Sequence, residues 1–335
     1  MSSKTSVAVI GSSGAVGQEI VRLLEREPWR DATISLFGSE RSAGSSVPFR
    51  GENLTVNLLS TDNIVGYNIV FVAATSNVSR HIVPILASFS TFVVDNTSAF
   101  RMDPSVPLVI PEINFDSIAP GCRLVANPNC CTIIMLMAVA PLRVFGRIRR
   151  IIVSTYQSAS GAGRPAMEEL ETATRAALDG RPFEPQVLPH PYGFNLFSHN
   201  TPIGPEGYNG EEEKIIAETR KILDDPEIMV NPTCVRVPVL RSHSESITVE
   251  FDGPAPAESD VREVLATFPG VCVVDDRENN RFPMPIDANG QGDVLVGRIR
   301  KDISNPNALS LFVCGDQLLK GAALNAVQIA EKQFA

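Results

Sequence analysis

Short apolar runs alternate with stretches of helical periodicity as far as about residue 145 of the chain. Uninterrupted apolar runs predict buried strands, and apolar residues that recur every three or four positions predict amphipathic helices. The predicted strands are 7–10, 33–37, 68–74, 91–95 and 122–126, and the predicted helices are 18–26, 78–88 and 132–142. Because strands that alternate with helices build a parallel, doubly wound sheet, this part is predicted to be an α/β domain of the Rossmann type.

The pattern changes after residue 147, where longer strands with alternating side chains replace the regular strand and helix order. The predicted strands are 151–157, 235–240, 246–252 and 294–300, and the predicted helices are 165–178 and 211–223. This order is typical of an α+β domain with a mostly antiparallel sheet. We therefore predict one domain over 1–130 and a second over 131–316. The segment 317–333 is amphipathic. We predict that it belongs to a C-terminal helix, 317–335, that packs on the first domain.

A glycine turn connects the first strand to the first helix. Gly11 permits a tight turn, Gly14 lets backbone amides approach a pyrophosphate, and Gly17 allows the helix to pack closely on the strand. The alternative is a plain glycine-rich turn. Because the string follows the first strand and opens a helix, dinucleotide binding is the favoured interpretation.

The second strand ends near the position at which such folds distinguish the two nicotinamide cofactors. Arg41 and Ser42 suit a 2′-phosphate, whereas Glu40 leaves room for a carboxylate that binds the ribose hydroxyls of NAD. We favour NADP. Taken alone, Arg41 is equally well explained as a solvated loop charge.

A cysteine follows a proline-containing turn directly before the apolar run 132–142, in the string Asn127-Pro-Asn129-Cys130. At a helix N-terminus, free backbone N–H groups and the helix dipole favour the thiolate, which attacks carbonyl and acyl carbons. Cys130 is therefore a candidate nucleophile. By itself the signal is modest, because buried cysteines are commonly inert core residues.

Length and composition set limits on these predictions. A chain of 335 residues can form two domains with sizeable cores, and its apolar and charged fractions are those of an ordinary globular protein. Its net charge of −9 argues against broad nucleic-acid binding, and no run has the length of a membrane span. The N-terminus lacks a signal-peptide core, so we expect a cytoplasmic protein, or one in an organelle stroma after loss of a transit peptide.

The six cysteines include no C-x-x-C pair, and the four histidines form no known metal-binding spacing. We therefore expect reduced cysteines and no bound metal. His243 has the pKa range of a proton shuttle, although a lone histidine is more often structural.

Three later clusters contain residues that could serve the thiol. The loop 157–163 follows a strand and is rich in small residues, so its amides could approach a substrate or a nicotinamide. Glu211 and Lys214 begin a helix, where a solvated helix start is the simpler explanation. Arg236 shares a predicted strand face with Pro238 and Leu240, so it would need an anionic partner if buried.

The chain resembles the aspartate-semialdehyde dehydrogenase family nearly from end to end. The motifs that carry the resemblance, in chain order, are Gly11 to Gly17, Arg41 to Gly44, Asp95 to Arg101, Asn127 to Cys130, Gln157 to Gly163, Glu211 to Lys214, Arg236 to His243 and Lys320 to Val327. The resemblance implies a Rossmann-type NADP domain followed by an α+β catalytic and dimerisation domain. It also implies an NADPH-dependent enzyme of lysine, threonine and methionine biosynthesis.

The resemblance assigns a role to each matching residue. Cys130 would be the acylated nucleophile, His243 the acid/base, and Gln157 the group that positions the substrate. Arg236 and Glu211 would bind the substrate carboxylate and amino group, and Arg101, Asn129 and Lys214 would form the phosphate site. The residues expected to bind NADP are Gly11, Ser13, Gly14, Ala15, Val16, Arg41, Ser42, Ser160, Gly161 and Asn325.

The implied reaction converts L-aspartyl 4-phosphate to L-aspartate 4-semialdehyde through a cysteine thioester. A thioester accepts hydride more readily than a carboxylate does, a base must handle the thiol proton, and a cationic pocket must hold the phosphate. Backbone amides at the start of the Cys130 helix are expected to steady the developing oxyanion.

Two alternatives remain open. The related N-acetyl-gamma-glutamyl-phosphate reductases use the same cysteine and histidine chemistry on a longer, acetylated substrate, and Glu211 discriminates because a free amino group needs an acid. A catalytically silent paralogue would have no need of Cys130, Gln157, Arg236 and His243 together. The expected partners are small-molecule substrates and a second copy of the chain, in a homodimer or a dimer of dimers, with no nucleic acid and no membrane.

Overall fold

The computed structural model describes residues 5–334, which form two compact units. One unit contains the residues up to Pro128 and those from Ala322 onward, and the other runs from Asn129 to Gly321. Each unit contains one seven-stranded sheet, which confirms the predicted fold class. The domain limits predicted from the sequence, 1–130 and 131–316, stay predictions.

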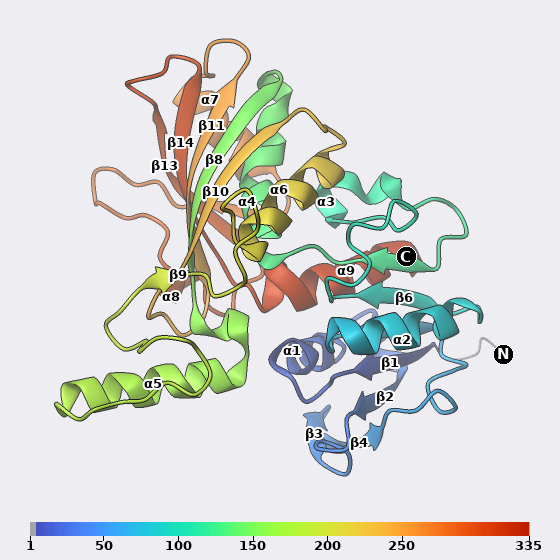
Figure 1. Ribbon diagram of the computed structural model, residues 1–335. Helices are drawn as coiled ribbons and strands as arrows, with labels where there is room; N and C mark the ends of the chain where they lie inside the picture. Colours follow the sequence, from blue (N-terminus) through green and yellow to red (C-terminus); the bar gives the residue numbers. More distant parts are fainter. Residues whose placement is uncertain (1–4, 335) are drawn as a thin grey trace. The chain divides into compact units, whose positions relative to one another are not determined.

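The sheet of the first unit has the order β3-β4-β2-β1-β5-β6-β7, and all neighbours are parallel except β3 and β4. Its strands are β1 (Ser6–Ile10), β2 (Thr33–Gly38), β3 (Ser46–Phe49), β4 (Glu52–Leu58), β5 (Ile69–Val72), β6 (Phe92–Asp95) and β7 (Leu124–Ala126) (Figure 1). Its helices are α1 (Ala15–Leu23), α2 (Ser76–Ala87), α3 (Pro111–Asn114) and α9 (Leu324–Phe334), with short helical turns at Trp29–Asp31 and Phe115–Ser117.

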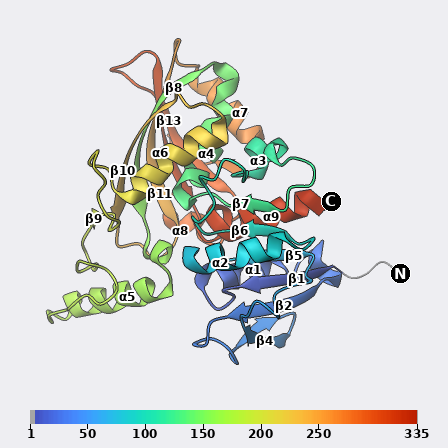
Figure 2. The same ribbon diagram turned by 45° about the vertical axis from the view of Figure 1, so that its right-hand side comes forward.

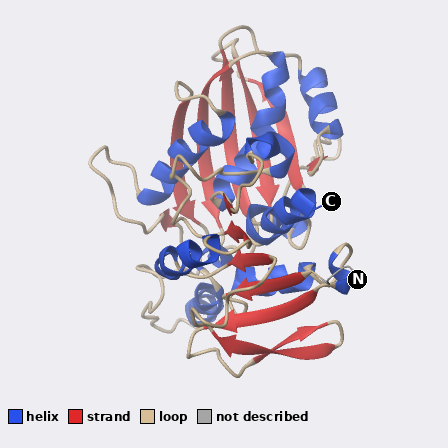
Figure 3. Ribbon diagram, turned by 90° about the vertical axis from the view of Figure 1, so that its right-hand side faces the viewer, coloured by secondary structure: helices blue, strands red, loops and turns tan. Residues whose placement is uncertain are grey.

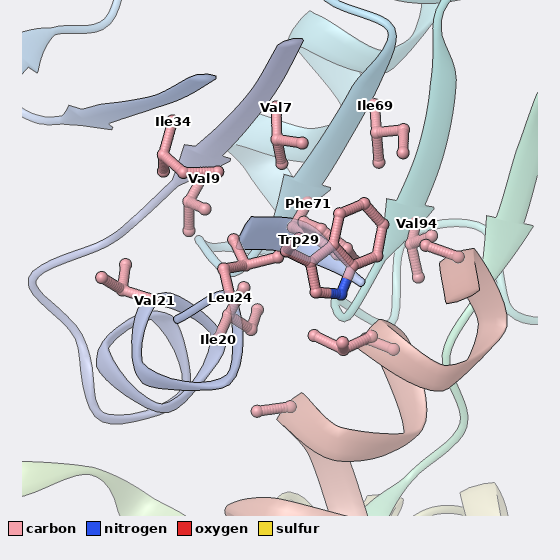
Figure 4. Packing of buried hydrophobic residues seen from close by; sticks show 14 of the residues in the cluster. Val7, Val9, Ile20, Val21, Leu24, Trp29, Ile34, Ile69, Phe71 and Val94 are labelled. Carbon is pink, nitrogen blue, oxygen red and sulfur yellow. The ribbon is translucent and has the colours of Figure 1, made fainter. Parts of the chain in front are cut away.

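Alternate side chains of β1 pack on opposite faces of this sheet. Val7 and Val9 belong to a core that includes residues of α1 and α9, whereas Ala8 and Ile10 belong to a core that includes residues of α2. Figure 4 shows the first of these cores around the indole of Trp29. Helices thus cover both faces, which is why the four buried residues Val7 to Ile10 are all apolar.

The sheet of the second unit has the order β12-β13-β14-β11-β8-β10-β9. Figure 3 draws the strands of both units in red and their helices in blue. The strands of the second unit are β8 (Ile148–Gln157), β9 (Phe197–Ser198), β10 (Met229–Arg236), β11 (His243–Phe251), β12 (Val271–Val273), β13 (Val294–Lys301) and β14 (Ala308–Gly315). Its helices are α4 (Cys130–Val139), α5 (Arg164–Leu178), α6 (Gly210–Leu223), α7 (Glu258–Thr267) and α8 (Pro285–Ala288), with helical turns at Ala140–Phe145, Ala159–Ala162 and, reaching the end of the unit, Leu319–Ala323. Four of the six neighbouring pairs are antiparallel.

Helices α4 and α6 contact each other (Figure 2), and both begin at residues predicted to be functional. Helix α4 is apolar on all sides and buried from Cys131 to Val139, as expected of a helix within a core. Helix α6 begins with a capping box, in which Asn209 caps the helix and Glu212 accepts a hydrogen bond from the Asn209 N–H. These two starts hold the first turns of both helices in fixed positions.

Several predicted boundaries were wrong. The strand expected at 235–240 is β10, which ends at Arg236 because the chain turns through Val237 and Pro238. Helix α1 begins three residues before the predicted start, and the segment expected to be helical from residue 317 passes through a turn at Leu319–Ala323 before α9 begins. The strands β3, β4, β9, β12 and β14 and the helices α3, α7 and α8 were not predicted.

Among residues 5–334, no helix has both the length and the apolar character needed to cross a membrane.

Candidate active site and cofactor-binding residues

The turn between β1 and α1 is shaped by two glycines that admit no side chain. A Cβ added to Gly11, where φ is +80°, would lie 2.2 Å from the carbonyl oxygen of Ala73, and one added to Gly17 would lie 2.2 Å from that of Gly11. Gly14 is the N-cap of α1 and has no side chain that could occupy the first amides of the helix. Ser13, Ala15 and Val16 complete a backbone cradle that fits the pyrophosphate of a dinucleotide.

The other residues predicted to bind NADP differ in their surroundings. Arg41 is exposed in the turn after β2, where Ser42 Oγ donates to the carbonyl oxygen of Ser39 over 3.2 Å. Asn325, in contrast, is fully buried, and its amide donates to Asn127 Oδ1 over 2.8 Å and to the carbonyl oxygen of Val109 over 2.9 Å. Its contacts are those of a structural residue, and a role of Asn325 in binding NADP stays a prediction.

Cys130 is the first residue of α4, and the preceding Asn129 caps the helix. The Asn129 Oδ1 atom accepts hydrogen bonds from the N–H groups of Cys131, over 3.0 Å, and Thr132, over 3.2 Å. These two amides are therefore occupied, which argues against their expected part in stabilising an oxyanion. The Asn129 N–H donates in turn to Glu218 Oε2 over 2.6 Å.

The Cys130 thiol lies in surroundings that favour its ionised form. A hydrogen bond from the Cys131 thiol, together with the nearby His243 ring, holds the pKa of Cys130 well below its ordinary value, despite the opposing effect of burial. Burial raises the pKa of Cys131, so that thiol keeps its proton and remains a donor. Cys131 thus supports the nucleophile through its hydrogen bond.

Replacing Cys131 by alanine should therefore raise the apparent pKa of Cys130, by about one pH unit. The measurement is the rate at which iodoacetamide alkylates Cys130 as a function of pH, with the modified residue located by mass spectrometry. Cys131→Ser is the matched control because its hydroxyl can still donate. Equal pH profiles for the alanine and serine variants would contradict the role given to the hydrogen bond.

His243 begins β11 and is fully buried. Its Nδ1 atom lies 3.0 Å from the backbone nitrogen and 3.1 Å from the hydroxyl oxygen of Ser158. One ring nitrogen and the sulfurs of Cys130 and Cys131 all lie within 4.8 Å of one another. The expectation that no metal is bound stays a prediction.

A buried carboxyl group lies two residues further along β11. Glu245 has no exposed surface, and burial raises the pKa of its carboxyl well above its ordinary value, an effect that the charge of Cys130 increases. The raised pKa favours the neutral form of this carboxyl, which is the form that does not oppose the Cys130 thiolate. Sequence reasoning missed Glu245, and only its position at i+2 from His243 could have pointed to it.

Glu211 gathers three of the residues predicted to bind substrate. Its Oε1 atom accepts from Asn129 Nδ2 over 2.8 Å and from Gln157 Nε2 over 3.1 Å, and its Oε2 atom lies 3.0 Å from Lys214 Nζ. Burial opposes ionisation, but Lys214 and the hydrogen bonds outweigh it and lower the pKa of Glu211 to about 2. Glu211 is therefore a fully charged acid beside the nucleophile.

This pKa makes a testable contribution to stability at low pH. A carboxyl with a folded-state pKa of about 2, against an unfolded value of 4.5, stabilises the protein above pH 4.5 by about 3 kcal/mol, and this stabilisation is lost as the pH falls from 4.5 towards 2. Urea unfolding at pH 7 and pH 4 should show a smaller loss of stability in Glu211→Gln than in the unmodified protein. Equal losses would show that Glu211 does not titrate as described.

Arg236 is the last residue of β10 and is 4 % exposed. Its guanidinium donates to His199 Nε2 over 2.9 Å and to the carbonyl oxygen of Ser158 over 3.4 Å. Among residues 5–334, the structure gives it no carboxylate partner, so the anionic partner expected for a buried arginine is not supplied by the described chain. Since β10 ends at Arg236, the predicted strand face shared with Pro238 and Leu240 was wrong.

His199 is a second residue that sequence reasoning missed. It follows β9, and burial, together with the charge of Arg236, lowers its pKa to about 4 in spite of the nearby Glu211, so it is neutral at pH 7. As a neutral acceptor at Nε2 it holds the Arg236 side chain, while Nδ1 lies 3.2 Å from Thr201 Oγ1. The signal in the sequence was a lone histidine, which is too common to stand out.

The second unit thus brings together most of the predicted catalytic and substrate-binding residues. These are Asn129, Cys130, Gln157, Glu211, Lys214, Arg236 and His243. Ser160 and Gly161 lie in the turn Ala159–Ala162 of the same unit, and a Cβ at Gly161 would lie 3.0 Å from His243 Cε1. Arg101 belongs to the first unit, where it is buried and donates to the carbonyl oxygen of Asn96 over 3.1 Å.

Two family profiles match the chain. The semialdehyde dehydrogenase NAD-binding domain matches residues 6–120, and the semialdehyde dehydrogenase dimerisation domain matches residues 139–320. The aspartate-semialdehyde dehydrogenase of Prochlorococcus marinus is 48% identical over 97% of this chain and 95% of its own length. The chain belongs to the aspartate-semialdehyde dehydrogenase family.

Further relatives within the aspartate-semialdehyde dehydrogenase family agree. The enzyme of Synechocystis sp. is 48% identical over 99% of this chain and 98% of its own length. The crystal structure of aspartate semialdehyde dehydrogenase II from Vibrio cholerae has a TM-score of 0.93 and 38% sequence identity, and it covers 98% of both chains. The predictions of an NADP-dependent aldehyde dehydrogenase of amino-acid biosynthesis, with a dimerisation domain, are confirmed.

Proposed function

We propose that Cys130 carries out the chemistry of this enzyme as a thiolate that attacks the acyl carbon of L-aspartyl 4-phosphate. The observation that carries this proposal is the lowered pKa of Cys130 at the start of α4, beside His243 and within the group of residues that Glu211 gathers. The sulfur–carbon bond forms, the carbon–oxygen bond to the phosphate breaks, and phosphate leaves. The product of this step is a thioester on Cys130.

NADPH, when bound, supplies the hydride that reduces the thioester. Gly11, Ser13, Gly14, Ala15 and Val16 would hold its pyrophosphate, and Arg41 and Ser42 its 2′-phosphate. In the second unit, Ser160 and Gly161 would line the cofactor next to the histidine. The thiohemiacetal that follows releases L-aspartate 4-semialdehyde and regenerates the Cys130 thiolate, while His243 serves as the acid/base for the sulfur and the substrate oxygen.

Two charged side chains would recognise the amino-acid part of the substrate. Arg236 is a buried cation with neutral protein partners, which suits it to a substrate carboxylate. Glu211 is a buried, ionised acid, which suits it to a free ammonium group. Gln157, which already donates to Glu211, would hold the acyl group near the thiol.

The phosphate would be bound by Arg101, Asn129 and Lys214. Lys214 keeps part of its surface exposed, so its ammonium group can leave Glu211 for an incoming phosphate. The Asn129 amide reaches Glu211 from beside Cys130, next to the expected position of the leaving group. Arg101 would contribute the remaining positive charge.

Phosphate-dependent reduction of NADP by the purified enzyme, with L-aspartate semialdehyde as substrate, tests the assignment in the reverse direction. We expect turnover that requires phosphate. N-acetylglutamate semialdehyde is the matched control because it lacks the free amino group that Glu211 would bind. Preference for the acetylated aldehyde would contradict the assignment and favour the related reductase, and no turnover with either would favour a silent paralogue.

We also propose that the chain works in the cytoplasm as a homodimer that can pair further into a dimer of dimers. The dimerisation-domain profile over residues 139–320 supports the dimer, and the six free cysteines suit a reducing compartment. Sedimentation of the purified enzyme should give a mass of two or four chains. A monomeric mass at micromolar concentration would contradict the proposal.

A further inference from the structure

The orientation of the His243 ring depends on the backbone N–H of Ser158, which can donate a hydrogen bond but cannot accept one. The backbone N–H of Ser158 donates to His243 Nδ1 over 3.0 Å. Because a backbone N–H can only donate, Nδ1 must present its lone pair. The neutral ring therefore carries its proton on Nε2, and Nε2 is the nitrogen left to face the Cys130 thiol.

A chain of buried side chains leads from the same nitrogen to Gln317. The Ser158 hydroxyl lies 3.1 Å from His243 Nδ1 and 3.1 Å from the Ser160 hydroxyl, and Gln317 Nε2 donates to Ser160 Oγ. Ser158, Ser160 and Gln317 are each at most 2 % exposed. We call these four residues the Gln317–His243 chain.

The far end of this chain is fixed by a second backbone donor. The N–H of Ser242 donates to Gln317 over 2.8 Å, which identifies the accepting atom as Oε1 and leaves Nε2 to point at Ser160. With Gln317 donating to it, the Ser160 hydroxyl sends its own proton to Ser158, its other partner among the described residues. Ser158 in turn directs its hydroxyl proton to Nδ1, so every donor in the chain points towards the ring.

We propose that Gln317 is a positioning residue for the catalytic histidine: through Ser160 and Ser158 it directs a second donor at Nδ1, which supports the tautomer with the proton on Nε2 that the Ser158 backbone N–H sets. The inference rests on the proposed role of His243. Ser160, which the sequence predicts to line the cofactor, would also connect Gln317 to Ser158 through its hydroxyl. It also explains why the residues between Asp316 and Leu319 are buried beside the site, outside any regular element.

This tautomer suits the chemistry of the reductive direction. In the reductive direction the only net proton is the one taken up by the departing phosphate, which leaves as hydrogen phosphate; transfer of hydride and expulsion of the thiolate need no further proton. The intermediates are a sulfur anion and an oxyanion, and both are stabilised by a donor that stays in place. An Nε2–H group is such a donor, whereas a bare Nε2 lone pair would repel both anions.

Nitrogen-15 spectra of the enzyme, prepared with histidine labelled at Nδ1 only, test the proposal directly. Protonated and unprotonated ring nitrogens resonate far apart, and the signal of His243 is identified by its absence in His243→Gln. We expect an unprotonated Nδ1 signal for the neutral ring of His243, without cofactor or substrate. A protonated Nδ1 signal would overturn the proposal.

The variant Gln317→Glu tests whether Gln317 supplies the side-chain donor at Nδ1. Its carboxylate can still accept from Ser242, but towards Ser160 it can only accept, so the hydroxyl protons of Ser160 and Ser158 reverse and the Ser158 hydroxyl no longer donates to Nδ1. The backbone N–H of Ser158 still donates, so we expect the Nδ1 signal to stay unprotonated and to shift downfield, towards that of a ring nitrogen that accepts fewer hydrogen bonds. Ser160→Ala interrupts the chain, so Gln317→Glu should have little effect in that background. An equal effect of Gln317→Glu with and without Ser160→Ala would show that the added charge acts on His243 through space. That result would overturn the role proposed for the Gln317–His243 chain.

Turnover separates this inference from the proposed function. If His243→Gln keeps full activity while the labelled signal is as expected, the proposed role of His243 fails and the tautomer stands. If His243→Gln is inactive and Nδ1 is protonated in the unmodified enzyme, the role stands and the inference fails.

Discussion

Replacement of Cys130 by serine is expected to lower turnover by at least about 10³-fold in both directions. The serine hydroxyl keeps the size of the thiol, but it does not ionise at neutral pH and forms an ester, which is a poorer hydride acceptor than a thioester. The hydrogen bond that lowers the pKa of the Cys130 thiol cannot make an alcohol into an anion at this pH. The measurement is kcat for L-aspartate semialdehyde oxidation with NADP and phosphate.

Cys131→Ser is the control for that loss, because the two cysteines are adjacent and chemically alike. It should retain most of the activity, since its hydroxyl still donates to the Cys130 sulfur. NADP binding, measured by calorimetry, should be unchanged in both variants. If the Cys131 variant were the inactive one, the assignment of the nucleophile would be wrong.

Replacement of Arg236 by leucine should lower kcat/KM for L-aspartate semialdehyde roughly 10²- to 10³-fold, mainly through KM, because a buried hydrogen-bonded charge pair is worth about 3–4 kcal/mol. Arg236→Lys should recover only part of the loss. The lysine ammonium is a single point charge and cannot donate to His199, Ser158 and a carboxylate as the planar guanidinium can. Steady-state kinetics with varied aldehyde at saturating NADP and phosphate provide the measurement.

The control for Arg236 is Arg164→Lys, a change at an exposed arginine that pairs with Glu168 on the surface of α5. It should leave kcat and KM unaltered. Thermal unfolding of each variant checks that the fold is retained. An unchanged KM in a folded Arg236→Leu enzyme would rule out binding of the substrate carboxylate by Arg236.

The parts of the site that the sequence predicted are those with a local signal. The glycine turn needs Gly11 and Gly17 because a Cβ at either position would collide with backbone atoms. The spacing of these glycines can be recognised directly in the sequence. Cys130 follows an Asn-Pro-Asn string that ends in a helix cap, which is also local. The alternation of strands and helices in the first unit follows from hydropathy in the same way.

The parts that were missed depend on contacts between distant residues. His199 approaches Arg236 across 37 positions of sequence, and Ser158 approaches His243 across 85. Contacts between residues so far apart produce no recognisable sequence pattern within a window of ten or twenty residues. The strand β10 was misplaced because Arg236 to Leu240 alternates like a strand, although Pro238 cannot donate to a neighbouring strand.

The position of α9 has a consequence for the synthesis of the chain. Ala323, Ala326 and Val327 belong to the same core as Val7 and Val9, so the first unit contains both ends of the described chain. A ribosome that adds about 5–20 residues per second needs roughly 15 to 60 seconds between the two. During that interval the part of the apolar face that α9 covers stays open, while the residues of the second unit have all been made before the first is complete. The nascent chain is therefore most exposed to aggregation and chaperone capture at its N-terminal sheet, and a stop codon before α9 would leave that face open permanently.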